Sequence, residues 1–370
     1  MIVSENPFDR VLQVIDSSRA KDINSLPFGF PRFEQYLPGI EQGTYYLITG
    51  NTGAAKTQIT DAMFMFHPFE FLSTHKELGI KLKIFYFSLE ISLEKKILMM
   101  ISHYLKIKHN LSVSPRQLES KRLGEALGDD MFEKVKEGRS YVEKLMECVT
   151  IYQDIHNPFG IYKVIDNYAK SNGEIKHREQ EFVRKNETTG EKETYTQDVF
   201  DHYIPNDPNE YVIIIIDSLN LLLPEKVNGV QMDLKGAMEK VSKEAIMFCN
   251  RYKYIPVFIQ QQSGQQESLD NFKAKKLRPS LNGLGETKLT GRDSAVCIGV
   301  FNPIRHELSS DLQYDMEIMQ DNYKSIEILK DRYGQAGVKV GLGFNGACNY
   351  FTELPKPGEI NYEEILKKIK

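Results

Sequence analysis

The feature that most constrains the fold of this chain is an uninterrupted apolar run, YVIIIID, at residues 211–217. A strand that faces water on one side alternates apolar and polar residues, so this run indicates a strand buried on both faces. Similar strands are expected at 45–49, 83–90, 254–260 and 294–301, with helical patterns at 93–106, 131–147 and 232–253. Strands and helices that alternate in this way predict an α/β fold with a mainly parallel central sheet flanked by helices.

The composition of the 370 residues is that of a folded globular chain, with 41% hydrophobic residues. The 47 Lys and Arg against 51 Asp and Glu give a net charge of −4, so any attraction to polyanions must be local. The four cysteines lie far apart without CxxC spacing, which argues against a zinc site or a disulfide framework. The chain begins without a signal-peptide pattern, and its apolar runs are far shorter than the ~20 residues of a membrane span. We therefore expect a cytoplasmic protein that does not cross a membrane.

Three segments are expected to stand apart from the main sheet strands. Residues 6–20 begin with Asn and Pro and form a short amphipathic helix, which packs either on its own domain or on a neighbouring subunit. Residues 171–209 are polar and predict a solvated β-hairpin insertion. Residues 325–334 and 339–344 predict a C-terminal β-hairpin. The apolar stripe of the first helix is Phe8, Val11, Leu12 and Ile15.

The segment GNTGAAKT at 50–57 follows a predicted strand and fits the P-loop pattern G-x-x-x-x-G-K-[ST]. Gly50, Lys56 and Thr57 match this pattern, whereas Ala55 replaces its second glycine. If Ala55 needs a positive φ, its side chain costs about 1–2 kcal/mol. The alternative is a glycine-rich turn with a chance Lys-Thr pair. We predict binding of ATP or another NTP with Mg²⁺ through Gly50, Asn51, Thr52, Gly53, Ala54, Ala55, Lys56 and Thr57.

Polar side chains end three of the predicted strands, at the edge where open α/β sheets bind their ligands. Asp217 closes the Ile run and can hold Mg²⁺ together with Thr57, although a helix cap is the simpler alternative. Glu90 follows the second strand and can polarise a water molecule, or it can be an acid in a first helical turn. A glutamine cluster ends IPVFIQQQS (255–263), where an amide can sense the γ-phosphate or merely end the strand.

Residues 263–293 form a long stretch that contains glycines and many cations. Exposed cations of this kind suit a nucleic-acid backbone, although a solvated charge run remains the alternative. Phe272 in the same stretch either stacks on a base or anchors the stretch to the core. The candidate DNA-binding residues are Lys273, Lys275, Lys276, Arg278, Lys288 and Arg292.

Seven segments taken in order resemble the DnaB-like hexameric replicative helicases, which are RecA-fold ATPases of helicase superfamily 4. The resemblance covers roughly residues 26–355. FGFPRFEQYLPGIEQG is similar to the segment that opens the family's ATPase domain, GNTGAAKT to its Walker A and IIIIDSLNLL to its Walker B. FSLEIS is similar to the family's FSLEMS, IPVFIQQQS to its strand ending in Ser-Gln, RPSLNGLGETKLTGRDSAV to its RP..DLRESG.IEQDAD and LKDRYGQAG to its KQRNGPTG hairpin.

The resemblance implies a RecA-like P-loop NTPase core and roles for individual residues. Lys330 and Arg332 correspond to the cations that reach into the neighbouring subunit's site, and Glu90 to the catalytic glutamate. The family's glutamine aligns with Gln262, with Gln261 as the neighbouring choice. The implied activity is ATP-dependent translocation on single-stranded DNA that unwinds duplex DNA. The implied assembly is a homo-oligomeric ring, expected to be a hexamer, with a primase or helicase loader as further partners.

The resemblance also suggests how the chain is divided. We expect a linker helix at 1–25, a RecA-like domain at 26–355 with the insertion at 171–209, and a tail at 356–370. The helical N-terminal domain of bacterial members is missing from this sequence, and so is a primase zinc module. A chain reduced in this way suits a bacteriophage genome, so the cytoplasm is that of a bacterium or of an infected host.

Two other functions fit parts of the sequence. A RecA-like recombination ATPase shares the nucleotide site but not the SLE and KDR segments, and it forms filaments instead of rings. A nucleotide-binding loader or scaffold with weak hydrolysis is suggested by Ala55. Particle shape distinguishes the first from a helicase, and ATP turnover with single-stranded DNA distinguishes the second.

Overall fold

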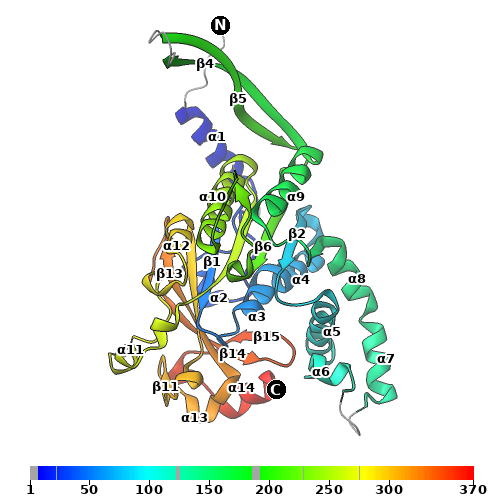
Figure 1. Ribbon diagram of the computed structural model, residues 1–370. Helices are drawn as coiled ribbons and strands as arrows, with labels where there is room; N and C mark the ends of the chain where they lie inside the picture. The colour runs from blue at the N-terminus through cyan, green and yellow to red at the C-terminus, as the bar shows by residue number, and fades with distance from the viewer. Residues whose placement is uncertain (1–6, 22, 122–125, 186–191, 228, 275) are drawn as a thin grey trace.

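The computed structural model describes residues 7–21, 23–121, 126–185, 192–227, 229–274 and 276–370, and a nine-stranded sheet runs through its centre (Figure 1). The strand order is β15-β14-β13-β10-β1-β9-β6-β2-β3. Strands β10 to β3 in this order are parallel, whereas β13, β14 and β15 are antiparallel, which confirms a mainly parallel sheet. The bounds are β1 Tyr46–Gly50, β2 Lys81–Ser88, β3 Val149–Tyr152, β6 Glu210–Asp217, β9 Ile255–Gln261, β10 Val296–Phe301, β13 Tyr323–Asp331, β14 Lys339–Asn345 and β15 Tyr350–Glu353.

The Ile run of β6 is buried on both faces, as its lack of alternation predicts. Ile213 and Ile215 pack with the helices α3, α4 and α5, whereas Ile214 and Ile216 pack with α9 and α10 on the opposite face. Each fully buried isoleucine contributes about 1.5–3 kcal/mol to stability, so this register is strongly specified. The helices are α3 Lys56–Asp61, α4 His67–Thr74, α5 Leu93–His109, α7 Asp129–Glu137, α8 Arg139–Cys148, α9 Pro158–Ser171 and α10 Leu234–Tyr252.

Two details of the helical prediction need refinement. The pattern at 131–147 indicates one helix, but Gly138 divides it into α7 and α8, consistent with the low helix propensity of glycine. Between α3 and α4 the chain forms a π-helical turn, Ala62–Phe66. The short elements are α2 Pro31–Glu34, α6 Pro115–Leu118, α11 Leu269–Lys273, α12 Leu289–Asp293, α13 Met316–Met319, β7 Lys226–Val227, β8 Val230–Gln231, β11 Ser310–Asp311 and β12 Tyr314–Asp315.

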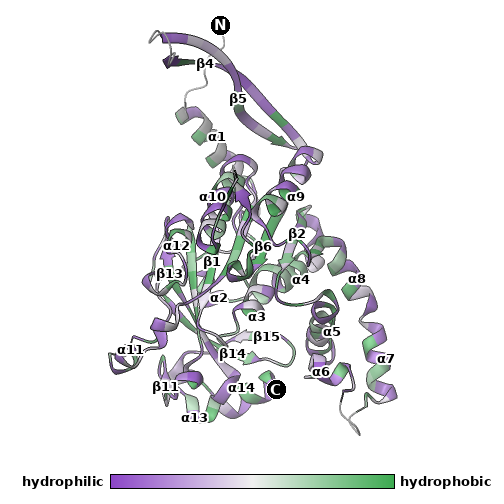
Figure 2. Cartoon of the chain, in the orientation of Figure 1, coloured by the Kyte–Doolittle hydropathy of each residue, from purple (hydrophilic) through white to green (hydrophobic). Residues whose placement is uncertain are grey.

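The predicted N-terminal helix and the predicted insertion both extend beyond the central sheet (Figure 1). Helix α1, Pro7–Arg19, exposes the four apolar side chains of its predicted stripe by 47–64%. The insertion is a long antiparallel hairpin of β4, Gly173–Lys185, and β5, Lys192–Pro205. Its strands are mainly hydrophilic in Figure 2, as expected for a solvated arm.

The C-terminal part of the chain extends the sheet at one edge. Strands β13 and β14 form the predicted hairpin, and β15 continues it. The expected tail at 356–370 contains α14, Tyr362–Ile369, whose last residue is fully buried. Ile369 packs in a small cluster with Met319 and Tyr323, so this helix covers the end of the β13–β14 hairpin.

Candidate nucleotide site

The turn between β1 and α3 has the backbone shape of an anion-binding loop. Gly53 and Ala55 have φ of 74° and 68°, and left-handed residues in such a turn direct backbone N–H groups toward a common centre. The Asn302 Nδ2 donates to the Gly53 carbonyl at 3.2 Å. A Cβ at Gly50 would lie only 2.5 Å from the Val300 carbonyl oxygen, so this position requires glycine. Neighbouring strands therefore hold the loop in place at the N-terminus of a helix, which favours anions.

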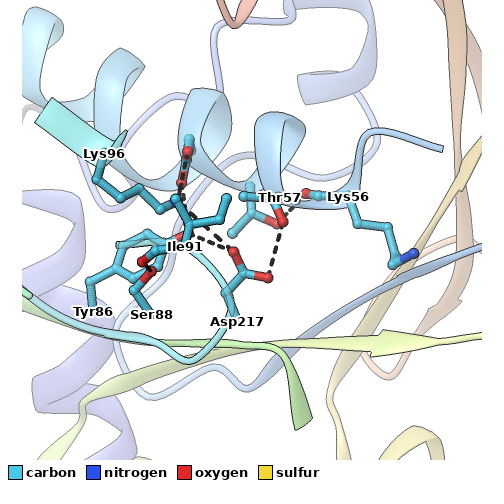
Figure 3. A network of polar contacts seen from close by, with 9 residues as sticks. Lys56, Thr57, Tyr86, Ser88, Ile91, Lys96 and Asp217 are labelled. Atoms are coloured by element: carbon cyan, nitrogen blue, oxygen red, sulfur yellow. Dashed lines mark hydrogen bonds and ion pairs between the residues drawn. The ribbon is translucent and has the colours of Figure 1, made fainter. Parts of the chain in front are cut away.

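Lys56 is the first residue of α3 and the cation closest to this turn in sequence. Its Nζ donates to the Asn51 carbonyl at 3.0 Å. Burial lowers the pKa of Lys56 to about 8, although the carboxylates of Asp217 and Glu90 oppose this shift. Figure 3 shows its side chain extending away from the Asp217 carboxylate. Because a carbonyl alone holds the ammonium poorly, the position suits an anionic ligand.

Thr57 and Asp217 lie next to each other across the site (Figure 3). The Thr57 Oγ1 donates to Asp217 Oδ1 at 3.0 Å, and the Tyr86 hydroxyl hydrogen-bonds the other carboxylate oxygen at 3.1 Å. Asp217 ends β6 and is 1% exposed. A hydroxyl and a carboxylate beside a phosphate-binding turn are the hard oxygen groups that Mg²⁺ prefers, so these residues fit that ion.

A cavity of about 400 Å³ opens between the turn and the ends of the neighbouring strands. The predicted residues Thr52, Gly53, Ala55, Lys56 and Thr57 line it. Asn51 and Ala54 are 4% and 2% exposed, and with Gly50 they support the turn from behind. The structure therefore brings five of the eight predicted residues to the cavity and gives the other three a supporting position.

Glu90 lies at the rim of this cavity on the turn that follows β2. The Ser88 hydroxyl donates to the Ile91 carbonyl at 2.6 Å and closes this turn. The Leu89 N–H donates to the Asp217 carbonyl at 2.8 Å, which ties the turn to the end of β6. Glu90 is exposed and lines the cavity, so its carboxylate can contact a water molecule there.

Among the glutamines, Gln261 lines the cavity and Gln262 does not. The Gln262 amide instead donates to Thr49 Oγ1 at 2.9 Å and to the Ser280 carbonyl at 3.1 Å. Successive side chains of a strand point to opposite faces, so only one of two neighbours can reach the cavity. The predicted position of Gln262 at the γ-phosphate is therefore wrong, and the neighbouring Gln261 occupies the place expected for a sensor.

The cavity wall opposite the turn comes from residues that the sequence did not single out. Lys324 is 1% exposed and donates to Asp321 Oδ1 at 2.6 Å. Its ammonium lies 4.6 Å from the centre of the Phe344 ring, and both side chains line the cavity. Beneath Asp217, the buried Asp61, Tyr86 and Lys96 form a polar cluster that was also missed. Only three-dimensional contact unites these residues, because no sequence motif contains them.

Lys330 and Arg332 lie at the other edge of the sheet. Strand β13 is antiparallel to β10, so Asp331 pairs with Val296 at the start of that strand. The Lys330 Nζ donates to the carbonyls of Gly291, Arg292 and Ser294, and burial lowers its pKa. The Arg332 guanidinium is exposed and donates to the carbonyls of Arg292 and Asp293 at 3.3 Å. The structure therefore does not bring either cation to the cavity of its own chain.

The predicted DNA-binding cations do not form one patch. Lys273 and Lys276 are exposed at α11, whereas Lys288 and Arg292 flank α12, far from α11 in Figure 1. The reason is that α12 packs on α10 and carries the chain back along the sheet. Lys275 lies outside the described residues. Phe272 on α11 is 50% exposed and does not anchor the stretch to the core.

Arg278 differs from the other cations of this stretch because its guanidinium is paired within the chain. It forms ion pairs with Asp311 and, at 3.8 Å, with Glu327. It also lies 4.8 Å from the centre of the Phe301 ring, with only 22% of its side chain exposed. These contacts favour a structural position for Arg278 instead of the predicted DNA contact.

Solved structures identify the fold. A solved helicase ATPase domain matches with a TM-score of 0.66 at 16% identity, over 95% of this chain and 99% of that one. A DnaB-like replicative helicase, solved for its interactions with primase, matches with a TM-score of 0.64 at 16% identity, over 96% and 69%. The RadB recombinase matches with a TM-score of 0.43 at 10% identity, over 86% and 96%. No family model and no curated protein matches the chain.

The chain thus has the RecA-like fold of DnaB-like helicase ATPase domains, and it is of the nucleotide-hydrolysing class that this fold and the P-loop site define. This confirms the resemblance noted in the sequence at the level of structure. Across the described residues, no helix combines the length and apolarity that crossing a membrane requires.

Proposed function

We propose that the protein is an ATP-driven, DnaB-like replicative helicase that forms a cytoplasmic ring, with six copies as the expected number, and translocates on single-stranded DNA. The observation that carries this proposal is the separation of its candidate catalytic cations. Lys56 lies at the carboxyl edge of the sheet, whereas Lys330 and Arg332 lie at the amino edge. A site that uses all three cations therefore requires two copies of the chain, as a closed ring provides.

The residues at the carboxyl edge suit the nucleotide half of this site. The P-loop turn and Lys56 bind the triphosphate, Thr57 and Asp217 hold Mg²⁺, and Glu90 takes a proton from the attacking water. The bound Mg²⁺ supplies charge that offsets the phosphate oxygens. Gln261 faces the same cavity and continues into the 263–293 stretch, so it can transmit the state of the γ-phosphate.

Arg332 is proposed to complete the site of a neighbouring copy, with Lys330 beside it. Its guanidinium is exposed and is held only by carbonyl groups of the described residues. An arginine supplied by a neighbour can stabilise transition-state charge by a rate factor of about 10³–10⁵. The exposed apolar face of α1 also favours contact with a neighbouring copy over contact with its own domain.

The DNA contact is proposed to centre on α11. Lys273 and Lys276 are exposed beside Phe272, which offers an aromatic face for a base. Since the chain has a net charge of −4, several copies of this surface must converge to attract a DNA backbone. A ring with α11 toward its channel provides this convergence. A primase or a helicase loader remains a proposed further partner.

Measurement of ATP turnover with and without single-stranded DNA, together with electron microscopy, tests the proposed function. We expect closed rings and a turnover that single-stranded DNA stimulates. Nucleotide binding without stimulated turnover would support a loader or scaffold instead. Open filaments in place of rings would support a recombination ATPase.

A further inference from the structure

A buried lysine lies directly beneath the carboxylate proposed to hold Mg²⁺. Lys96 belongs to α5 and is 1% exposed, which is rare for a lysine without a binding partner. Its Nζ donates to both carboxylate oxygens of Asp61, at 3.1 and 3.0 Å, and to the Tyr86 hydroxyl at 2.5 Å. An ammonium group has three N–H donors, so these contacts use all of them.

Tyr86 connects this lysine to the nucleotide site. Its hydroxyl lies 2.8 Å from Asp61 Oδ1 and 3.1 Å from Asp217 Oδ2. A hydroxyl donates only one proton, and Asp61 already accepts two hydrogen bonds from Lys96. The proton of Tyr86 is therefore best used toward Asp217 Oδ2, since the other cation near that oxygen in the described chain is Lys96, at the longer distance of 3.9 Å.

Together these contacts fix the orientation of the Asp217 carboxylate. Tyr86 holds Oδ2 from the core side, and Thr57 contacts Oδ1 from the cavity side (Figure 3). The charge of Lys96 also offsets two buried carboxylates, Asp61 and Asp217, that would otherwise repel each other. An ion pair with only a packing role would not need the hydroxyl that reaches the nucleotide site.

We propose that Lys96, Asp61 and Tyr86 form a positioning relay, from the ammonium through the phenol to Asp217, that prepares this carboxylate for nucleotide-bound Mg²⁺. The inference rests on the proposed function, because Asp217 must serve the metal of a bound nucleotide. The three relay residues are absent from the lining of the cavity as the described residues form it, so they act through Asp217 as positioning residues. Groups that orient a metal ligand from behind typically change metal affinity by about 10–100-fold.

The first test is Tyr86→Phe, which removes one hydroxyl and keeps the buried ring and the Lys96–Asp61 pair. Binding of a fluorescent ADP analogue is measured with EDTA and across a Mg²⁺ titration. We expect affinity in EDTA to match the parental protein, since the P-loop is unchanged, and the Mg²⁺ requirement to rise by about tenfold or more. The matched control is Tyr46→Phe, because the Tyr46 hydroxyl is also buried but donates to the Gly39 carbonyl away from the site.

The second test separates positioning from packing. The double variant Asp61→Leu with Lys96→Met replaces the buried pair by apolar side chains, a change that often preserves folding. We expect thermal unfolding near that of the parental protein, together with the raised Mg²⁺ requirement of Tyr86→Phe. A parental Mg²⁺ requirement in both Tyr86→Phe and the folded double variant would overturn the relay while leaving the proposed function intact. If the parental protein itself shows no Mg²⁺-dependent nucleotide binding, the proposed function fails and the relay fails with it.

Discussion

The two edges of the sheet hold their cations in different ways. At the carboxyl edge, Lys56 lines a cavity with Thr57, Glu90 and the oxygens of Asp217. At the amino edge, Lys330 and Arg332 contact backbone carbonyls, and neither lines the cavity of the P-loop. The first arrangement is a prepared phosphate site, whereas the second is a pair of cations that backbone carbonyls hold.

The strand register shows why these two edges cannot meet within one copy. Tyr46 of β1 pairs with Val296 of β10, which pairs with Asp331, while the P-loop follows Gly50. The four steps along β1 from Tyr46 to Gly50 cover roughly 13 Å at about 3.3 Å per residue. We therefore infer that the two edges serve one reaction only when a second copy aligns its amino edge with the first copy's cavity.

The largest expected effect comes from removing the cation of the carboxyl edge. Lys56→Ala should reduce ATP hydrolysis below detection, because the phosphate site loses its buried charge. Hydrolysis is measured by phosphate release, with Lys144→Ala, an exposed lysine of α8, as the matched control. Turnover at the parental rate in Lys56→Ala would remove the nucleotide site from the carboxyl edge.

The next effect comes from the amino edge. Arg332→Ala should lower turnover by about 10³-fold or more, since a trans-acting arginine acts on the transition state. Binding of ADP should stay at the parental level, because the cavity of each copy is unchanged. The control is Arg184→Ala on the exposed hairpin arm. A loss of ADP binding equal to the loss of turnover would contradict the division between the edges.

The pH dependence of binding can sharpen the comparison. Burial lowers the pKa of Lys56 to about 8 in the nucleotide-free protein, and the charged form attracts phosphate. Above that pH the free protein carries a neutral Lys56, so binding must take up a proton. Affinity for ADP should then fall by up to about tenfold per pH unit. In Lys56→Arg the charge persists and the fall should disappear, whereas a parental affinity that is constant up to a pH of about 9.5 would contradict this role.

The smallest expected effect concerns the backbone of the turn. Ala55 has a left-handed φ of 68°, which costs an L-residue about 1–2 kcal/mol relative to glycine. Ala54 has no positive φ, so Ala54→Gly serves as the control. We expect Ala55→Gly to be more stable than Ala54→Gly by about 1–2 kcal/mol in chemical unfolding. Equal stability of the two variants would show that Ala55 is not strained.

Much of the carboxyl edge could be predicted from the sequence because local patterns encode it. The Ile run of β6 identified a central strand, and its terminal Asp217 lies where such strands bind ligands. The P-loop turn is a contiguous segment between a strand and a helix. The choice between Gln261 and Gln262 failed because a shift of one residue reverses the face of a strand, and the sequence does not fix that register.

The buried relay could not be predicted for a different reason. Lys96 stands beside Lys95 in a charged helical segment, and such lysines usually face solvent. Its partners Asp61 and Tyr86 lie on α3 and β2, so only tertiary packing brings them together. The cations of 263–293 were treated as one loop because α12 is too short to show helical periodicity.

Mixing two inactive variants tests the shared site most directly. Glu90→Gln lacks a carboxyl-edge group, and Arg332→Ala lacks an amino-edge group. In mixed assemblies, some interfaces pair an intact Glu90 with an intact Arg332, so ATP turnover should return above that of either variant alone. Differently tagged variants that co-purify show that mixed assemblies form. If they co-purify and turnover stays at the level of the separate variants, the site does not span two copies.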